Sequence, residues 1–120
     1  MIQTPWGYAD SVKPIVDGIV SVSTPSHGGL RVTHKAFDDL VMDKGYLSKV
    51  AIKTRTHYWF EEDCAASLFM FDAPSVIKPW VKAHFDLDDG PSLDEKAETV
   101  FQNCKKITEY FYKEYFTSEG

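Results

Sequence analysis

The strongest pattern in the chain is a run of apolar residues near its C-terminus, spaced three and four positions apart. This spacing predicts one buried face of an amphipathic α-helix; its members are Ala97, Val100, Phe101, Cys104, Ile107 and Phe111. Ser92 and Glu95 have the spacing of a capping box, which predicts the start of the helix at Ser92. Further aromatic residues then either cap the core or form a contact patch. They are Tyr110, Tyr112, Tyr115 and Phe116.

Short β-like segments dominate the first third of the chain. Residues 18–23 are rich in Val and Ile, and residues 30–33 alternate between apolar and polar positions, so together they predict a β-hairpin with residues 24–29 at its tip. Upstream, residues 4–7 contain Pro and Gly and predict an irregular lead-in. Residues 9–16 are expected to form a short helical turn.

The middle of the chain predicts alternating helices and a strand. The spacing of Phe37, Leu40 and Val41 indicates a helix that ends at Lys44 and Gly45. In residues 46–56 apolar residues and basic residues fall on alternate positions, which favours a strand with one basic face. Helices are then expected at residues 59–71 and 76–85, the first with three acidic residues in its opening turn. Those residues are Glu61, Glu62 and Asp63.

These elements predict an α+β fold in one domain, residues 1–120. A small antiparallel sheet at residues 18–57 would be packed by about three helices, and the last of them would be long. With 120 residues, of which 43% are hydrophobic, the chain is large enough for a core of its own. Cys64 and Cys104 form no metal-binding or disulfide motif. No apolar run reaches the about 18 residues of a membrane span, and no secretory signal is expected, so we predict a cytoplasmic protein.

Charge is unevenly divided between the two halves. Residues 1–60 hold seven Lys/Arg and five Asp/Glu, whereas residues 61–120 hold six and thirteen. Such a chain can attract a partner by charge complementarity, although two solvated faces would give the same pattern. The isoelectric point of about 5.2 argues against nucleic-acid binding.

The segment Ser26-His27-Gly28-Gly29 is the leading candidate for a site. It can be a simple permitted turn, or Gly28 and Gly29 can present an anion-binding nest with His27 as acid, base or ligand. Because histidine titrates near neutral pH, it suits all three of these roles.

A second candidate lies at residues 61–64. Glu62 and Cys64 together with His27 permit a Cys–His–acid arrangement for a small hydrolase or transferase. The alternative is that the acidic residues serve the helix dipole and that Cys64 packs inward. A mixed metal site of His27, His34, His57 and the acids at residues 61–63 is a third option, but the spacing of these residues matches no metal motif. No metal and no cofactor are therefore expected.

Three of these motifs, in this order, resemble an uncharacterised domain family of bacteria, plasmids and phages. Family members carry Thr-Pro-Trp-Gly, then Ser-Thr-x-Ser/Gly-His-Gly-Gly, then Trp-Tyr-Glu-Glu-Asp-Cys; the chain matches at residues 4–7, 23–29 and 61–64. It departs at Tyr58-Trp59-Phe60, and the similarity covers about residues 3–70, without the C-terminal helix.

The resemblance implies that the His27 loop and the segment at residues 61–64 meet in space. It also suggests a mobile-element origin and a protein-binding module that inhibits a host defence protein. The contact surface would combine both motifs with the C-terminal aromatic residues, and exposed rings would also permit a homodimer. The residues expected there are Ser26, His27, Gly28, Gly29, Glu61, Asp63, Tyr112, Tyr115 and Phe116.

Overall fold

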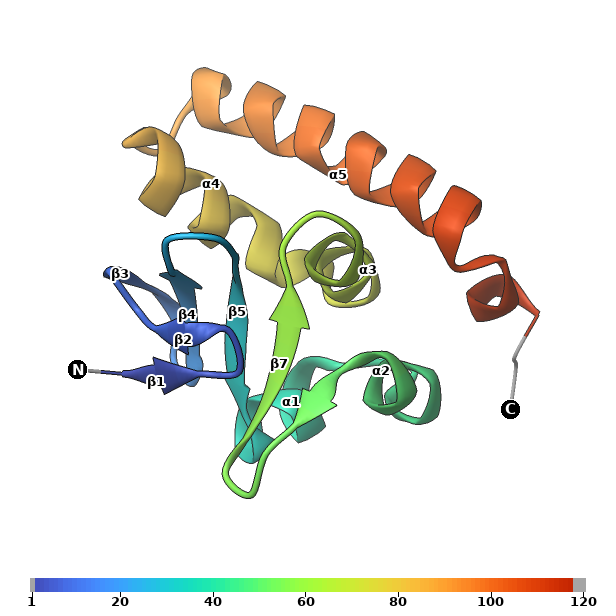
Figure 1. Ribbon diagram of the computed structural model, residues 1–120. Coiled ribbons are helices and arrows are strands. Elements are labelled where there is room, and N and C mark those ends of the chain that lie inside the picture. Colours follow the sequence, from blue (N-terminus) through green and yellow to red (C-terminus); the bar gives the residue numbers. More distant parts are fainter. Residues whose placement is uncertain (1, 118–120) are drawn as a thin grey trace.

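The computed structural model describes residues 2–117, which fold around a five-stranded antiparallel sheet (Figure 1). The strands lie in the order β3-β4-β5-β7-β6. Their bounds are Ser11–Val16 for β3, Ile19–Ser23 for β4, Gly28–Thr33 for β5, Ile52–Lys53 for β6 and His57–Glu61 for β7. A separate N-terminal hairpin pairs β1, Gln3–Thr4, with β2, Gly7–Tyr8.

Five α-helices and two short 3-10 helices make up the rest of the regular structure in residues 2–117. The α-helices are α1 His34–Leu40, α2 Lys44–Val50, α3 Cys64–Asp72, α4 Ile77–Phe85 and α5 Pro91–Phe111. The 3-10 helices are η1 Pro74–Val76 and η2 Lys113–Phe116. The predicted α+β class with a long C-terminal helix is confirmed, but the sheet begins at Ser11 and ends at Glu61, and the described residues form five α-helices rather than about three.

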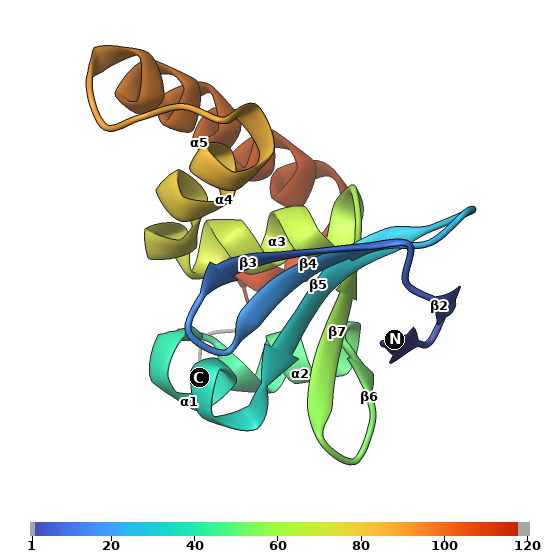
Figure 2. The same ribbon diagram turned by 90° about the vertical axis from the view of Figure 1, so that its left-hand side faces the viewer.

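The two faces of the sheet have different covers. One face carries the buried side chains of Ile19, Leu30 and Phe60, which join the main core together with Leu68 and Phe69 of α3. Figure 2 shows α3, α4 and α5 on this side and the β1–β2 hairpin on the other.

The N-terminal hairpin covers part of the second face through a pair of tryptophans. Trp6 lies between β1 and β2, and its ring meets that of Trp59 edge-on at 6.1 Å. Both faces of the sheet are therefore covered near β7, where the two candidate motifs converge.

The predicted C-terminal helix is confirmed, with a different start and a slightly rotated buried face. Its cap is Gly90, at a φ of 145°, and Pro91 occupies the first helical position, so the expected capping box at Ser92 is wrong. The buried residues are Leu93, Ala97, Cys104 and Thr108. Phe111, assigned to the buried stripe, is instead 57% exposed, because the buried stripe continues from Cys104 to Thr108.

The predicted β-hairpin is confirmed as β4 and β5, in the register Ile19↔Val32 to Ser23↔Gly28. Its tip is shorter than expected, because the two glycines belong to β5. The helical turn predicted at residues 9–16 is wrong: these residues form edge strand β3, where Pro14 is tolerated at the sheet margin. The lead-in expected to be irregular is the β1–β2 hairpin.

The middle of the chain differs most from expectation. The first helix ends at Leu40 instead of at Lys44 and Gly45, and the Asp43 side chain accepts from the Tyr46 amide at 3.1 Å to start α2. Most of the strand predicted at residues 46–56 is therefore helical, and only β6 remains of it. An aspartate cap outweighs the two-residue alternation here.

The helix predicted at residues 59–71 begins later than expected. Residues 57–61 form strand β7, and α3 starts at Cys64, so the three acidic residues precede the helix and do not occupy its first turn. Asp63 has a φ of 70°, which turns the chain from strand to helix. The helix expected at residues 76–85 is confirmed as α4 after the η1 turn.

Candidate functional site

The β4–β5 turn and the end of β7 meet at one place on the surface. Nδ1 of His27 lies 2.9 Å from Oε2 of Glu61, and the two side chains are 50% and 45% exposed. The Glu62 amide donates to the Gly28 carbonyl at 2.9 Å, which joins the two loops through the backbone. The meeting of these motifs, which the family resemblance implied, is therefore present in the structure.

Thr24 holds the turn that presents His27. Its amide and its hydroxyl both donate to the His27 carbonyl, at 2.7 and 2.9 Å, and its hydroxyl accepts from the His27 amide at 3.1 Å. Thr24 is buried while the His27 side chain reaches solvent. The imidazole thus stands on a fixed turn and can donate, accept or exchange a proton there.

Gly28 and Gly29 have a structural role that differs from the predicted anion-binding nest. Neither is among the described glycines with positive φ, and both lie in β5, so the nest is wrong. A Cβ atom on Gly29 would contact the Phe60 carbonyl oxygen and Cη2 of Trp6, the latter at 2.8 Å. At Gly28 it would lie 3.0 Å from Oε1 of Glu62. Glycine is required at both positions because the neighbouring strands β4 and β7 and the Trp6 ring leave no room for a side chain.

Among the described residues, the side-chain contact of His27 is with Glu61, and none is recorded with Glu62 or Cys64. Glu62 lies beside Gly28. Cys64 is half-buried at the start of α3. Burial raises the pKa of the Tyr112 hydroxyl, and Cys64 raises it further. Any catalytic role for these three residues stays a prediction.

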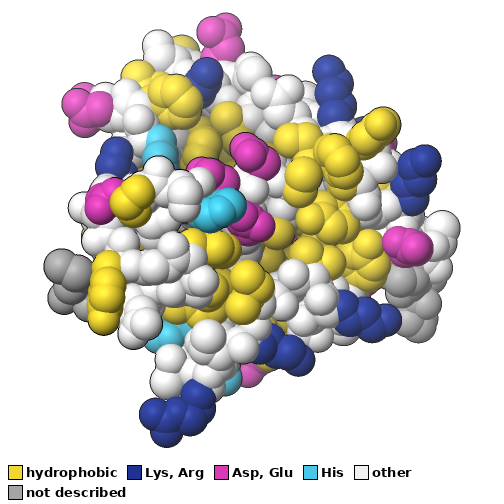
Figure 3. All heavy atoms as spheres, viewed as in Figure 1, with side chains coloured by type: hydrophobic (Ala, Val, Ile, Leu, Met, Phe, Trp, Pro, Cys, Tyr) yellow, Lys and Arg dark blue, Asp and Glu magenta, His cyan; other side chains and the backbone are white. Residues whose placement is uncertain are grey.

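The aromatic residues beyond α5 divide into buried and exposed groups. The Tyr115 hydroxyl donates to Oδ1 of Asp72 at 2.6 Å, and the Tyr115 ring packs against Tyr46 at 5.8 Å, so Tyr115 anchors η2 to the core. Tyr112 is half-buried against the same tyrosine. Phe116 is 45% exposed. Figure 3 shows hydrophobic side chains gathered over α3 and the C-terminal half of α5, beside acidic side chains that surround a histidine.

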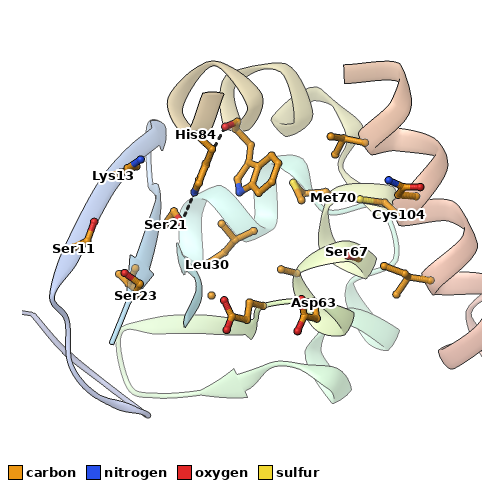
Figure 4. A pocket seen from close by; sticks show the side chains of 18 residues that line it. Ser11, Lys13, Ser21, Ser23, Leu30, Asp63, Ser67, Met70, His84 and Cys104 are labelled. Atoms are coloured by element: carbon orange, nitrogen blue, oxygen red, sulfur yellow. Dashed lines mark hydrogen bonds between the residues drawn. The ribbon is translucent and has the colours of Figure 1, made fainter. Parts of the chain in front are cut away.

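A cleft of about 550 Å³ lies on the other side of the Glu62–Asp63 loop, between the sheet and helices α3, α4 and α5 (Figure 4). Oγ of Ser21 lies 3.1 Å from Nε2 of His84, and Nδ1 of His84 lies 2.9 Å from the Trp80 carbonyl oxygen. The imidazole also stacks on the Trp80 ring at 4.4 Å.

The Ser21–His84 pair was not predicted from the sequence. Two signals were available: Ser21 interrupts a β-branched strand on the same parity as buried Ile19, and Trp80 and His84 are one helical turn apart.

Within the part of the chain that the structure describes, no three His, Cys, Asp or Glu residues are grouped to hold a metal ion. No helix in residues 2–117 is both long enough and apolar enough to cross a bilayer.

The fold and the two joined loops define a small α+β domain with an exposed histidine–carboxylate pair. Residues 1–116 match the family model of a domain of unknown function, DUF7007, and the chain belongs to this family. The match extends through α5, so the expectation that the family similarity stops near residue 70 is wrong. No significant match was found among curated proteins or among solved structures.

Proposed function

We propose that this protein is a protein-binding module whose contact surface is the exposed aromatic end of α5 and η2. The observation that carries the proposal is the exposure of three large rings at this end of the molecule: Tyr110 at 72%, Phe111 at 57% and Phe116 at 45%. We call these three residues the aromatic end. Aromatic side chains concentrate in the cores of protein interfaces, because each supplies a large, rigid contact area.

One residue beside the aromatic end is electrostatically coupled to the His27 loop. Tyr112 follows Phe111, and Glu61, the carboxylate that contacts His27, is among the groups that raise the pKa of the Tyr112 hydroxyl. The charged residues that flank the aromatic end carry both signs: Glu109 and Glu114 are acidic, and Lys105, Lys106 and Lys113 are basic. The partner that fits this surface has an apolar recess with charged residues of both signs at its rim.

The proposal extends to a biological setting. We infer a mobile-element protein that acts in the cytoplasm of the host cell, with a host defence protein as the partner. This extension rests on the motif resemblance at residues 4–7, 23–29 and 61–64. A second copy of the chain is the other partner that exposed rings would accept.

The test is quantitative capture from host lysate with three forms of the purified protein: wild type, Phe111→Ser and Tyr8→Ser. Tyr8 is 58% exposed on β2, so Tyr8→Ser is a matched change outside the surface. We expect one stoichiometric partner that Phe111→Ser loses by about tenfold or more and that Tyr8→Ser retains. Equal capture by all three forms, or no partner with wild type, would contradict the proposal. Light scattering of the same samples identifies a homodimer.

A small hydrolase or transferase is the second candidate. The 2.9 Å contact between His27 and Glu61 favours it, because a carboxylate can orient a histidine base. In this alternative Glu61 replaces Glu62 as the orienting residue. In an enzyme of this kind, His27→Ala would abolish turnover. A binding module would keep its partner after this change, and its affinity would fall only by what the His27 side chain contributes to binding.

A further inference from the structure

The cleft between the sheet and helices α3 to α5 is distinct from the aromatic end and has the size of a small-molecule site. Its volume of about 550 Å³ lies within the range of about 300 to 1,000 Å³ that is usual for such pockets. Sheet residues form one wall and three helices form the others (Figure 4). The exposed Glu62–Asp63 loop lies at one end.

The hydrogen-bond partners of His84 determine which atom donates and which accepts in the Ser21–His84 pair. The Trp80 carbonyl can only accept, so Nδ1 of His84 carries the proton and donates to it. In the neutral imidazole Nε2 then accepts, and the Ser21 hydroxyl donates to it. The lone pairs of Ser21 Oγ remain, so this wall offers the cleft an acceptor for a ligand's N–H group.

The end of the cleft at the Glu62–Asp63 loop also offers acceptors. Glu62 and Asp63 both line it, and ionised carboxylates only accept hydrogen bonds. The four ion pairs recorded for the described residues involve neither of these carboxylates. The cationic lining residue is Lys13, on exposed edge strand β3, and Figure 4 shows it at the opposite corner from Asp63. Two carboxylates against one ammonium make the lining net negative.

Apolar groups form much of the remaining surface. Trp80 presents an aromatic ring, and further apolar side chains complete the lining: Leu30, Met70, Val100 and Ile107. Burial raises the pKa of the Cys104 thiol, so Cys104 contributes a neutral sulfur to the same wall. A ligand suited to these walls has a hydrophobic body.

We propose that this cleft binds a small primary amine with an aromatic or branched apolar body. The ammonium group lies between Glu62 and Asp63, where two carboxylates face one cation. The body packs against Leu30 and Met70. Ser21 accepts from any further N–H group of the ligand.

The test is a titration of the isotope-labelled protein followed by amide NMR shifts. The probes are tryptamine, phenethylamine and isoamylamine, with indole-3-propionate as the anionic counterpart of tryptamine. We expect saturable shifts at cleft residues for at least one amine, and at least tenfold weaker binding of the anion. Saturation by no amine, equal binding of tryptamine and the anion, or shifts confined to the aromatic end would overturn the proposal.

Two matched double variants separate the local carboxylates from the overall charge. Glu62→Gln/Asp63→Asn removes both cleft carboxylates, and Asp86→Asn/Asp88→Asn removes two exposed carboxylates that do not line the cleft. We expect the first variant to weaken amine binding by about tenfold or more and the second by less than about twofold, because exposed charges at a distance are screened. Equal effects of the two variants would contradict the assigned position of the ammonium group.

Discussion

Asp72 and Glu61 each contact a side chain from a distant segment, but in opposite surroundings. Asp72 is fully buried and accepts from the Met42 amide at 2.7 Å, the Asp43 amide at 3.1 Å and the Tyr115 hydroxyl. Glu61 is 45% exposed and contacts His27. A buried carboxylate with three donors holds elements together, whereas an exposed pair adds little stability and stays accessible to a partner. The comparison separates residues that maintain the fold from those proposed to act on its surface.

The largest effect is expected for Asp72→Ala. The change removes the acceptor of three donors in the interior and should lower the free energy of unfolding by about 3 kcal/mol. Chemical denaturation measures this loss. Asp39→Ala, in an exposed pair with Lys35, is the control and should cost less than about 0.5 kcal/mol. A similar small loss for Asp72→Ala would remove the distinction between the two carboxylates.

Tyr115→Phe is expected to have the next largest effect. It deletes one hydroxyl that donates to a buried charge and leaves the two amide donors of Asp72 in place. The free energy of unfolding should fall by about 2 kcal/mol, the usual value for a hydrogen bond to a charged group. Tyr110→Phe is the matched control at an exposed position and should be neutral. If the two variants had equal stability, η2 would not be anchored through Asp72.

Alkaline pH should destabilise the same region. Burial raises the pKa of Tyr115, helped by its bond to Asp72 and by Asp43. Burial also raises the pKa of Tyr46, where Glu114 and Asp43 add to it, and of Tyr112. The unfolded tyrosines ionise near pH 10, so the folded state binds more protons above that pH. This stability is complete below about pH 10 and is lost as the pH rises through the raised pKa values.

Denaturation midpoints from about pH 8 to about pH 11 test this dependence. The decline should be shallower in Tyr115→Phe than in wild type, because one of the shifted groups is gone. Parallel curves for the two proteins would show that Tyr115 makes no contribution to the pH dependence.

The smallest effect on stability is expected for Glu61→Gln. It removes the charge of a half-exposed pair with His27 and should change the free energy of unfolding by about 0.5 kcal/mol or less. Capture of the partner should weaken by less than about tenfold, because rim charges affect association more than final affinity. A large loss of stability would instead place Glu61 among the residues that maintain the fold, with Asp72.

Strong periodicity made parts of the fold predictable. The β4–β5 hairpin and α5 each follow a pattern that fits only one type of element. Around residues 44–50 the pattern fits both a helix and a strand, and the Asp43 cap, which the periodicity does not include, favours the helix. In α3 nearly every position is apolar, so apolar and polar residues do not alternate with a helical period. The first residue of this helix could therefore not be located from the pattern.

The candidate site was predictable only where motifs marked it. His27 and residues 61–63 stood out because they lie in motifs, and the resemblance to the motif family implied that they meet. Ser21 and His84 are 63 positions apart, and only the packing of α4 against the sheet brings them together. The role of Gly28 and Gly29 was misjudged because their close neighbours, Trp6 and the end of β7, come from other segments.

The most direct test of the central claim is a hydrogen–deuterium exchange footprint of the captured complex. If the aromatic end is the binding surface, protection on binding will concentrate in the last turn of α5, in η2 and in the β4–β5 turn, and the amides of the β1–β2 hairpin will exchange as in the free protein. Protection confined to β1–β2 or to the α4–α5 connection, with the aromatic end unchanged, would contradict the account.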